Sequence, residues 1–314
     1  MSDSISRREL LRNVALTAAG VGLMACQRPA ADPAARASEA VVPASPDEAR
    51  LRQWSATLRR DAMTLDHVPI GRSATRVGEL AIGTPYEAFT LEAYLRAGGS
   101  PSRTEPLTLS LTKFDCVSLV EACLAVSRVA DNPSVPTWDS FGTEMERMRY
   151  RGGVRSGYTS RLHYFSEWIT DGAKRGLYKE LGAELGGIED SRPLRFMTEH
   201  RASYPALADD GVYREIGEME RTLDAQPRHV IPTARIPDIQ DRIESGDILA
   251  FATSIPGLDV SHAAFAYRDP AGVLRVLHAP LSGGVVEITR ATLPEYVAAI
   301  RRSTGILVAR PLRA

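Results

Sequence analysis

The chain has little of several features that define common protein classes. Its 314 residues include only three cysteines, 6% aromatic residues and a formal net charge of −1, from 38 basic and 39 acidic side chains. So few cysteines exclude a disulfide-rich scaffold. A balanced charge without a long basic run argues against a nucleic-acid partner, because such proteins gather Lys and Arg against phosphates. The sequence also lacks a Gly-x-Ser-x-Gly elbow, a Gly-x-x-x-x-Gly-Lys phosphate loop and a His-Glu-x-x-His pair, which disfavours serine-hydrolase, nucleotide-binding and zinc-peptidase classes.

The N-terminal segment has the pattern of an export signal. Arg7-Arg8 precedes a short apolar run over 14–25, and this run ends in Leu23-Met24-Ala25-Cys26. The arginine pair resembles a twin-arginine signal, and the last four residues resemble the lipobox at which a bacterial lipoprotein is cleaved and lipidated. The run is too short to span a bilayer. We therefore expect residues 1–26 to export the chain to the bacterial cell envelope, anchored through Cys26 and facing the periplasm.

A tether and one large domain are expected to follow. Residues 27–46 are mostly Ala, Pro and Ser without an apolar period, which is typical of a disordered linker with a reach of about 70 Å when extended. Residues 47–314 are long enough for one large domain or two closely joined ones.

The domain begins with helical patterns and ends with strand patterns. Apolar spacing predicts helices over Asp47–Thr64, Arg76–Ile82 and Cys116–Val129, and further helical patches interrupted by Gly and Pro in a segment at about 131–240. Short β-type runs bounded by turn residues follow. This order predicts an α+β fold with an antiparallel sheet and a helical insertion. The expected strands are Ile248–Ala252, Val260–Tyr267, Val273–Ala279, Val285–Thr289 and Ile306–Arg310.

Cys116 is the first candidate for chemistry. Asp115 is a good N-cap residue, so the pattern places Cys116 in the first turn of the helix. The helix N-terminus favours a thiolate there, whereas the Asp115 carboxylate opposes it, so we expect a cationic partner. Cys123 lies seven residues further along the helix, about 10 Å away, which is too far for a disulfide.

Two histidines on a predicted hairpin supply that partner. If Tyr267 pairs with Val273, His262 pairs directly with His278, with Cβ atoms about 5 Å apart. One imidazole then takes the proton of the Cys116 thiol, and the second orients the first, as in cysteine hydrolases. A rival interpretation is a zinc site, since Asp115, Cys116, His262 and His278 are all metal-ligand types.

These motifs carry a resemblance to a known group. They look like the catalytic core of the NlpC-type, papain-like cell-wall cysteine hydrolases, which implies a helix-start cysteine packed on an antiparallel sheet. The matching stretches are Asp115-Cys116, Ser261-His262-Ala263-Ala264-Phe265-Ala266, and Leu277-His278-Ala279 followed by Ser282-Gly283-Gly284.

Other stretches resemble one branch of this group, the N-acetylmuramoyl-L-alanine amidase-like family, over about residues 72–312. The resemblance implies that Cys116 is the nucleophile, His262 the general base and acid, and His278 the orienting residue. The sequence departs from the pattern of the broader group at Val117-Ser118, because that group usually has Ser-Gly directly after the cysteine. The stretches that carry it are Ile82-Gly83-Thr84-Pro85-Tyr86, the segment from Gly157 to Phe165, and Gly246-Asp247-Ile248-Leu249-Ala250-Phe251.

The resemblance also implies substrate contacts. Arg161 has two open interpretations: its guanidinium pairs with a substrate carboxylate, or it makes a surface salt bridge on an amphipathic helix that buries Leu162 and Phe165. The residues assigned to substrate binding are Tyr86, Asp115, Arg161, His163, Tyr164 and Ser261.

The expected function is hydrolysis of amide bonds in peptidoglycan or muropeptides, most simply the muramoyl–L-alanine bond. The γ-D-glutamyl–diamino acid bond is an alternative, and an inactive muropeptide-binding lipoprotein is an alternative of another class. The hydrolase interpretation requires no cofactor and no metal.

Overall fold

The computed structural model describes residues 44–280 and 284–313. The predicted signal, Cys26 and nearly all of the tether lie outside these residues, as do Ser282 and Gly283 of the resemblance. No helix within the described residues is long and apolar enough to cross a membrane.

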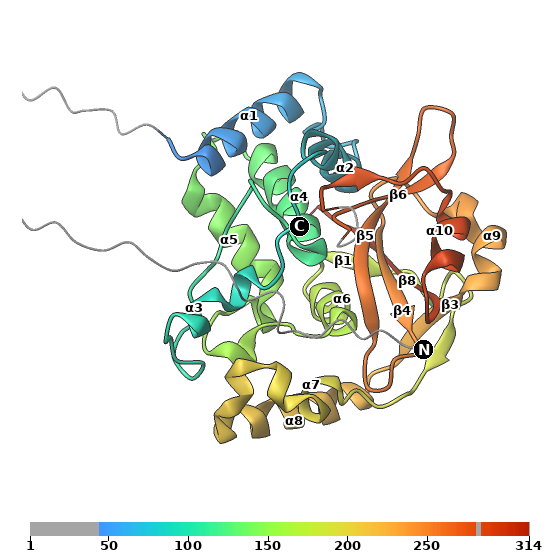
Figure 1. Cartoon of the computed structure of the whole chain (residues 1–314). Helices are drawn as coiled ribbons and strands as arrows, with labels where there is room; N and C mark the ends of the chain where they lie inside the picture. Colours follow the sequence, from blue (N-terminus) through green and yellow to red (C-terminus); the bar gives the residue numbers. More distant parts are fainter. Residues whose placement is uncertain (1–43, 281–283, 314) are drawn as a thin grey trace, which may run out of the picture. The chain divides into compact units, whose positions relative to one another are not determined.

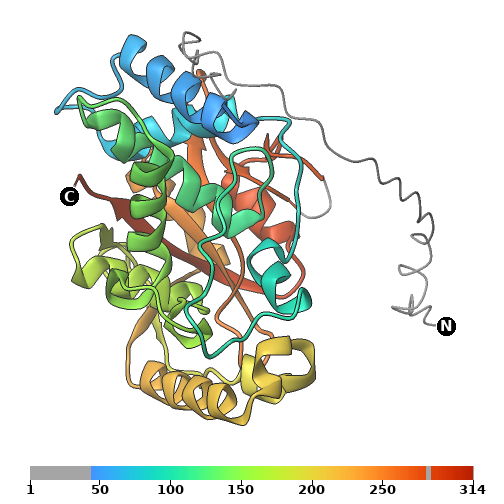
Figure 2. The same cartoon turned by 90° about the vertical axis from the view of Figure 1, so that its left-hand side faces the viewer.

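The helices that precede the sheet strands surround one central helix, α4 (Cys116–Asp131). The predicted N-cap is confirmed. The Asp115 side chain accepts a hydrogen bond from the Ser118 N–H, and the Ser118 hydroxyl accepts one from the Asp115 N–H, so two donors at the helix start are satisfied. From Leu119 to Ala130 every residue of α4 is buried, which requires neighbours on all sides. These are α1 (Pro46–Arg60), α2 (Ile70–Leu80), α5 (Trp138–Arg149) and strand β5, and α6 (Phe165–Lys174) packs against α5 and β5 beside them (Figures 1 and 2).

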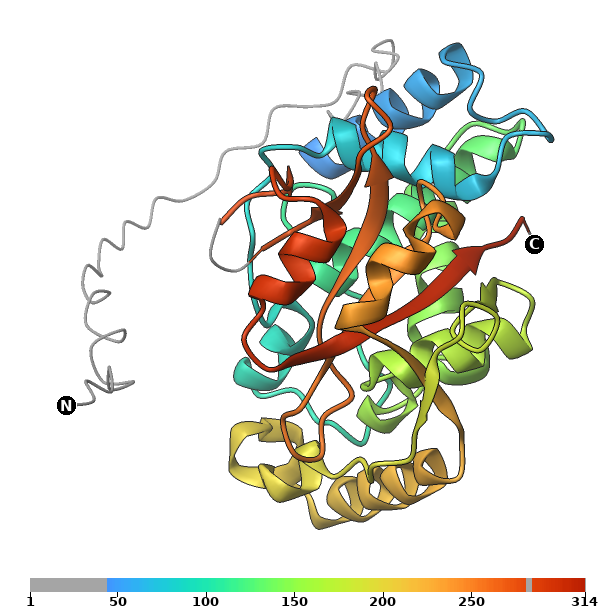
Figure 3. The same cartoon turned by 90° about the vertical axis from the view of Figure 1, so that its right-hand side faces the viewer.

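The strands form one antiparallel sheet in the order β2-β3-β8-β4-β5-β6-β7, with β1 also paired to β8. Helices cover both faces: the α4 layer lies on one, and α9 (Ile236–Ile239) and α10 (Leu293–Ala299) lie on the other (Figure 3). The α+β class with an antiparallel sheet is therefore confirmed. The strands are β1 (Tyr178–Glu180), β2 (Ile188–Asp190), β3 (Arg228–Pro232), β4 (Ile248–Thr253), β5 (Val260–Arg268), β6 (Leu274–His278), β7 (Glu287–Ile288) and β8 (Ser303–Pro311).

The segment at about 131–240 is more than a helical insertion, because it supplies β1, β2 and β3 to the same sheet. Its later part builds a separate small core around α8 (Asp210–Asp224), joined to the rest by the Tyr164 hydroxyl, which donates to Glu220. The remaining short helices are α3 (Ala93–Arg96), α7 (Phe196–Glu199), η2 (Thr90–Glu92), η3 (Arg151–Gly153), η4 (Tyr158–Ser160), η5 (Arg201–Ser203), η6 (Pro205–Ala208), η7 (Thr233–Arg235) and η8 (Gln240–Arg242).

The predicted register of the β5–β6 hairpin is wrong by two residues. Tyr267 pairs with Arg275 and not with Val273. The cause is the loop, in which Asp269 Oδ1 accepts from the N–H groups of Ala271 and Val273 and holds the turn at 269–273. A two-residue shift is one full pleat repeat, so residues keep their face of the sheet. His262 and His278 therefore lose direct pairing but remain on the same side.

The Gly246-Asp247 stretch has a structural task. Gly246 has φ = +93°, and a Cβ there would lie 2.1 Å from the Gly71 backbone in α2. Asp247 is buried and accepts two hydrogen bonds from Arg310 at 2.8 Å. Only glycine permits this close approach. Gly246 therefore lets α2 pack directly against the start of β4.

Candidate active site

Cys116 lies where the start of α4 meets β5. The backbone N–H of Ala263, the residue that follows His262, lies close enough to the thiol to oppose the rise in its pKa. The Cys116 side chain is partly exposed, whereas Cys123 is buried, and both thiols are free. One free thiol thus lies partly buried at a helix N-terminus, against the strand that carries a histidine.

The two histidines form a hydrogen-bonded pair. Nε2 of His262 lies 2.7 Å from Nδ1 of His278, and the rings meet edge to face with centroids 5.0 Å apart. The Phe251 ring stacks on His262 with an interplanar angle of 13°. Because Nε2 of His262 is engaged, Nδ1 is the nitrogen left to exchange a proton with another group.

Burial controls the charge state of this site. Burial and, to a smaller extent, the Asp115 anion raise the pKa of the Cys116 thiol to about 12, and the Ala263 N–H opposes both. Burial also lowers the pKa of His262 to about 3, with a smaller contribution from His278, whose own pKa burial lowers to about 4. These shifts favour a neutral thiol and neutral imidazoles over a thiolate–imidazolium pair.

Tyr86 reaches the same place through backbone pairing. Its N–H donates to the Gly284 carbonyl at 2.8 Å, and it bridges to Phe114 on its other side. Burial, with smaller contributions from the nearby Cys116 and Asp115, raises the pKa of Tyr86 to about 12. The segment around Tyr86 thus lies between the approach to α4 and the chain that leaves β6, with its half-buried phenol near Cys116.

Arg161 is occupied by carboxylates of the fold itself. It precedes α6 and is buried, with Nη2 3.2 Å from Glu92 and Nε 3.5 Å from Glu105. The interpretation as a surface salt bridge on a helix is wrong, because the helix begins only at Phe165. The guanidinium holds the η2 segment to the chain around Glu105.

His163, Tyr164 and Ser261 also have partners within the fold. His163 Nε2 lies 2.9 Å from the Tyr158 carbonyl, and burial lowers the pKa of this histidine well below its usual value. Tyr164 is buried against α8 through Glu220, as described above. Ser261 is exposed beside His262, and its hydroxyl donates to a backbone carbonyl of β4 at 3.3 Å. Of these three, only Ser261 borders the histidine pair.

Two residues that sequence reasoning missed contact His278. The Tyr296 hydroxyl of α10 lies 3.3 Å from Nδ1 of His278, and Glu287 Oε1 of β7 lies 3.7 Å from Nε2. A Thr292–Glu295 capping box signals the start of α10, but nothing local indicates that this helix reaches the histidines.

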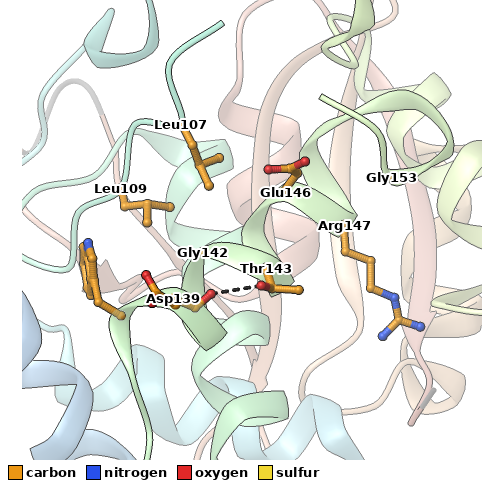
Figure 4. Close-up of a pocket in the computed structure, with 9 residues that line it drawn as sticks. Leu107, Leu109, Asp139, Gly142, Thr143, Glu146, Arg147 and Gly153 are labelled. Carbon is orange, nitrogen blue, oxygen red and sulfur yellow. Dashed lines mark hydrogen bonds between the residues drawn. The ribbon is translucent and has the colours of Figure 1, made fainter. Parts of the chain in front are cut away.

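The groove drawn in Figure 4 is not at Cys116. It measures about 550 Å³ and is lined by α5 residues that include Trp138, Asp139 and Glu146. A smaller cavity of about 200 Å³ has Ser118, two residues after Cys116, among its lining residues, together with Glu87 and Lys113. Both are lined by Leu109, so the two hollows adjoin.

The zinc interpretation gains no geometric support. Within the described residues, which include all four proposed ligands, no group of three or more His, Cys, Asp or Glu side chains is arranged to hold a metal ion.

The fold and this geometry define an α+β protein with a helix-start cysteine beside a histidine pair on an antiparallel sheet. The chain belongs to the N-acetylmuramoyl-L-alanine amidase-like family, whose model matches residues 76–306. A crystal structure of an N-acetylmuramoyl-L-alanine amidase from Bacteroides uniformis is similar, with 29% identity, a TM-score of 0.70, and coverage of 78% of this chain and 99% of the other.

Two other solved structures share the fold. A Bacteroides fragilis protein named a xylanase has 32% identity and a TM-score of 0.67, covering 74% of this chain and 99% of its own. A Legionella pneumophila protein matches at 18% identity with a TM-score of 0.60, over 85% of this chain and 94% of its own, and indicates the fold alone. No curated protein matches the chain.

Proposed function

We propose that this protein is a cysteine hydrolase that cleaves amide bonds of peptidoglycan or its fragments, and that its bond is the one between muramic acid and L-alanine. Membership of the amidase-like family and similarity to the Bacteroides uniformis amidase support the substrate class. The observation that carries the chemistry is the position of Cys116 at a helix start, against the strand whose His262 is hydrogen bonded to His278.

In the first half-reaction His262 acts as base. Its Nδ1 accepts the Cys116 proton while Sγ attacks the lactyl carbonyl carbon, and the carbonyl π electrons move to oxygen. Backbone N–H groups at the start of α4 stabilise the oxyanion. Proton transfer accompanies the attack, because the pKa shifts favour a neutral thiol and a neutral His262 before substrate binds. His278 holds the imidazole of His262 in place through the 2.7 Å hydrogen bond.

The second half-reaction restores the site. The His262 imidazolium donates its proton to the alanine nitrogen, the C–N bond breaks, and the stem peptide leaves as an amine. Cys116 then carries the muramoyl group as a thioester. Water gives a proton to His262 and attacks this thioester, which releases the muramic carboxylic acid and returns the proton to the thiol.

The bond is tested with defined muropeptides and product mass spectrometry, using the chain from Ser45 and its Cys116→Ala variant. Free stem peptide beginning with L-alanine, absent with the variant, is the expected result. A cut after the second stem residue supports the γ-D-glutamyl endopeptidase alternative instead. Binding without cleavage by a folded protein overturns the hydrolase proposal in favour of the muropeptide-binding alternative.

Substrate contacts and cellular location are further proposals. Tyr86 and Asp115, which lie next to Cys116, are the best placed of the sequence-derived candidates to border the substrate. We propose that residues 1–26 export the protein and that Cys26 receives the lipid anchor facing the periplasm. Cys26→Ser should then release the full-length protein from membranes into the soluble envelope fraction, while persistent membrane attachment contradicts the anchor.

A further inference from the structure

His278 has one polar atom that the mechanism leaves unexplained. Its side chain is 1% exposed, and its Nε2 is buried without a hydrogen-bond partner within the described residues. Buried nitrogen atoms are rarely left unpaired, because losing water without a replacement partner costs about 1–3 kcal/mol. The nearest charged group is Oε1 of Glu287 at 3.7 Å.

Glu287 is held at this position by the sheet. It pairs directly with His278 across β6 and β7, so the two side chains project from opposed strand positions on the same face. Its carboxylate is about half exposed, so the side chain has room to close the remaining gap. A glutamate rotamer change covers a shift of less than 1 Å without movement of the strand.

The contact decides which nitrogen of His278 carries the proton. A carboxylate only accepts hydrogen bonds, so the nitrogen beside it must be the donor, Nε2–H. The other nitrogen, Nδ1, then has its lone pair free. Two donors approach that lone pair: the imidazole of His262 at 2.7 Å and the Tyr296 hydroxyl at 3.3 Å.

The tautomer of His278 in turn determines the tautomer of His262. If Nδ1 of His278 accepts, Nε2 of His262 must carry hydrogen and donate. Nδ1 of His262 then keeps its lone pair, which is the state a base needs to remove the Cys116 proton. The opposite tautomer of His278 would instead make His262 an acceptor at Nε2 and a donor at Nδ1, and so block proton removal.

We propose that Glu287 is a positioning residue that sets the tautomers of both His278 and His262. The Tyr296 hydroxyl is a second donor, beside His262, to Nδ1 of His278. Glu287 touches neither substrate nor thiol and acts through the histidine pair. The catalytic consequence rests on the proposed hydrolase function, whereas the tautomer assignment does not.

The test compares Glu287→Ala with Glu287→Gln, which keeps an oxygen acceptor without the charge. Glu189→Gln is the matched control, because Glu189 faces His229 across β2 and β3 at the other end of the sheet. Histidine rings labelled with ¹⁵N report the tautomer directly, and loss of one signal set in His278→Asn assigns that residue among the six histidines.

We expect His278 to be a single Nε2–H tautomer in the starting protein and in the Glu189 control, and to lose that preference in Glu287→Ala. We expect kcat on muropeptide to fall about tenfold in Glu287→Ala, with KM nearly unchanged, and Glu287→Gln to recover most of it. An unchanged tautomer in Glu287→Ala overturns the proposal. If no protein cleaves muropeptide while the tautomer shifts as expected, the hydrolase function fails and the role of Glu287 in the pair stands.

Discussion

Asp115 affects Cys116 in two ways that a pair of substitutions separates. Its side chain caps α4 by accepting from the Ser118 N–H at 2.7 Å, and its negative charge raises the pKa of the Cys116 thiol. Asp115→Asn keeps an N-cap of similar strength and removes the charge, whereas Asp115→Ala removes both. The neutral cap should therefore make Cys116 more reactive without loss of stability.

The size of the effect follows from simple electrostatics. A neighbouring unit charge that is screened nearly as strongly as in water contributes about 1 kcal/mol, or roughly 0.7 pKa unit. The thiolate fraction of Cys116 then rises about fivefold, and the weaker nucleophilicity of a less basic thiolate reduces the gain in alkylation rate to about two- to threefold. Asp115→Ala should in addition lose about 1 kcal/mol of unfolding free energy.

The assay is the rate of iodoacetamide modification at Cys116, followed by peptide mass spectrometry, with urea unfolding of the same proteins. Buried Cys123 serves as an internal control for partial unfolding, since burial raises its pKa as well and shields it. An Asp115→Asn protein that alkylates more slowly than the starting protein, with its unfolding midpoint unchanged, refutes the reasoning.

Three further predictions concern stability, each measured by urea unfolding. Gly246→Ala should cost about 2–4 kcal/mol, because its Cβ meets backbone, whereas Gly83→Ala, with a similar φ of +83° and open space, should cost only about 1–2; equal losses contradict the close approach. Arg149→Met should cost about 3–5 kcal/mol by leaving the buried Glu121 carboxylate unpaired, and Glu121→Gln in the same chain should recover part of it. Burial lowers the pKa of His278 to about 4, so below pH 6.5 the unfolded chain binds more protons than the folded chain. Between pH 7 and 4.5 the unfolding free energy of the starting protein should therefore fall by about 2.5 kcal/mol more than that of His278→Asn. Parallel pH profiles of the two proteins contradict this.

Local chemistry made part of this fold predictable. The Asp115 cap and the apolar spacing after it predict the helix that begins at Cys116, because these signals act within a single helical turn. The late strands were also found from sequence, since their β-branched and apolar runs are bounded by turn residues. Strands β1, β2 and β3 were missed. β1 and β2 have only three residues each, with Lys179 or Glu189 at their centres, and β3 begins with Arg228-His229 and ends at Pro232, which gives no strand signal.

The geometry around the histidines depended on contacts that sequence does not show. A side chain in the loop, Asp269, decided the hairpin register, and a two-residue change kept the two rings within hydrogen-bond reach. The contacts of His278 with Glu287 and Tyr296 come from β7 and α10, whose positions follow from packing of the whole sheet. The neutral charge state likewise reflects burial, which a helix-start argument for a thiolate omits.

The mass of the protein during turnover tests most directly whether Cys116 forms a thioester with the substrate. The chain is mixed with a disaccharide tetrapeptide, quenched in acid within the first turnover, and its intact mass and peptide map are recorded. We predict an added muramoyl-containing disaccharide on Cys116, joined as a thioester that hydroxylamine removes. An adduct that contains L-alanine and D-glutamate would place the cut at the γ-D-glutamyl bond, and stem-peptide release by the Cys116→Ala protein would contradict a cysteine nucleophile altogether.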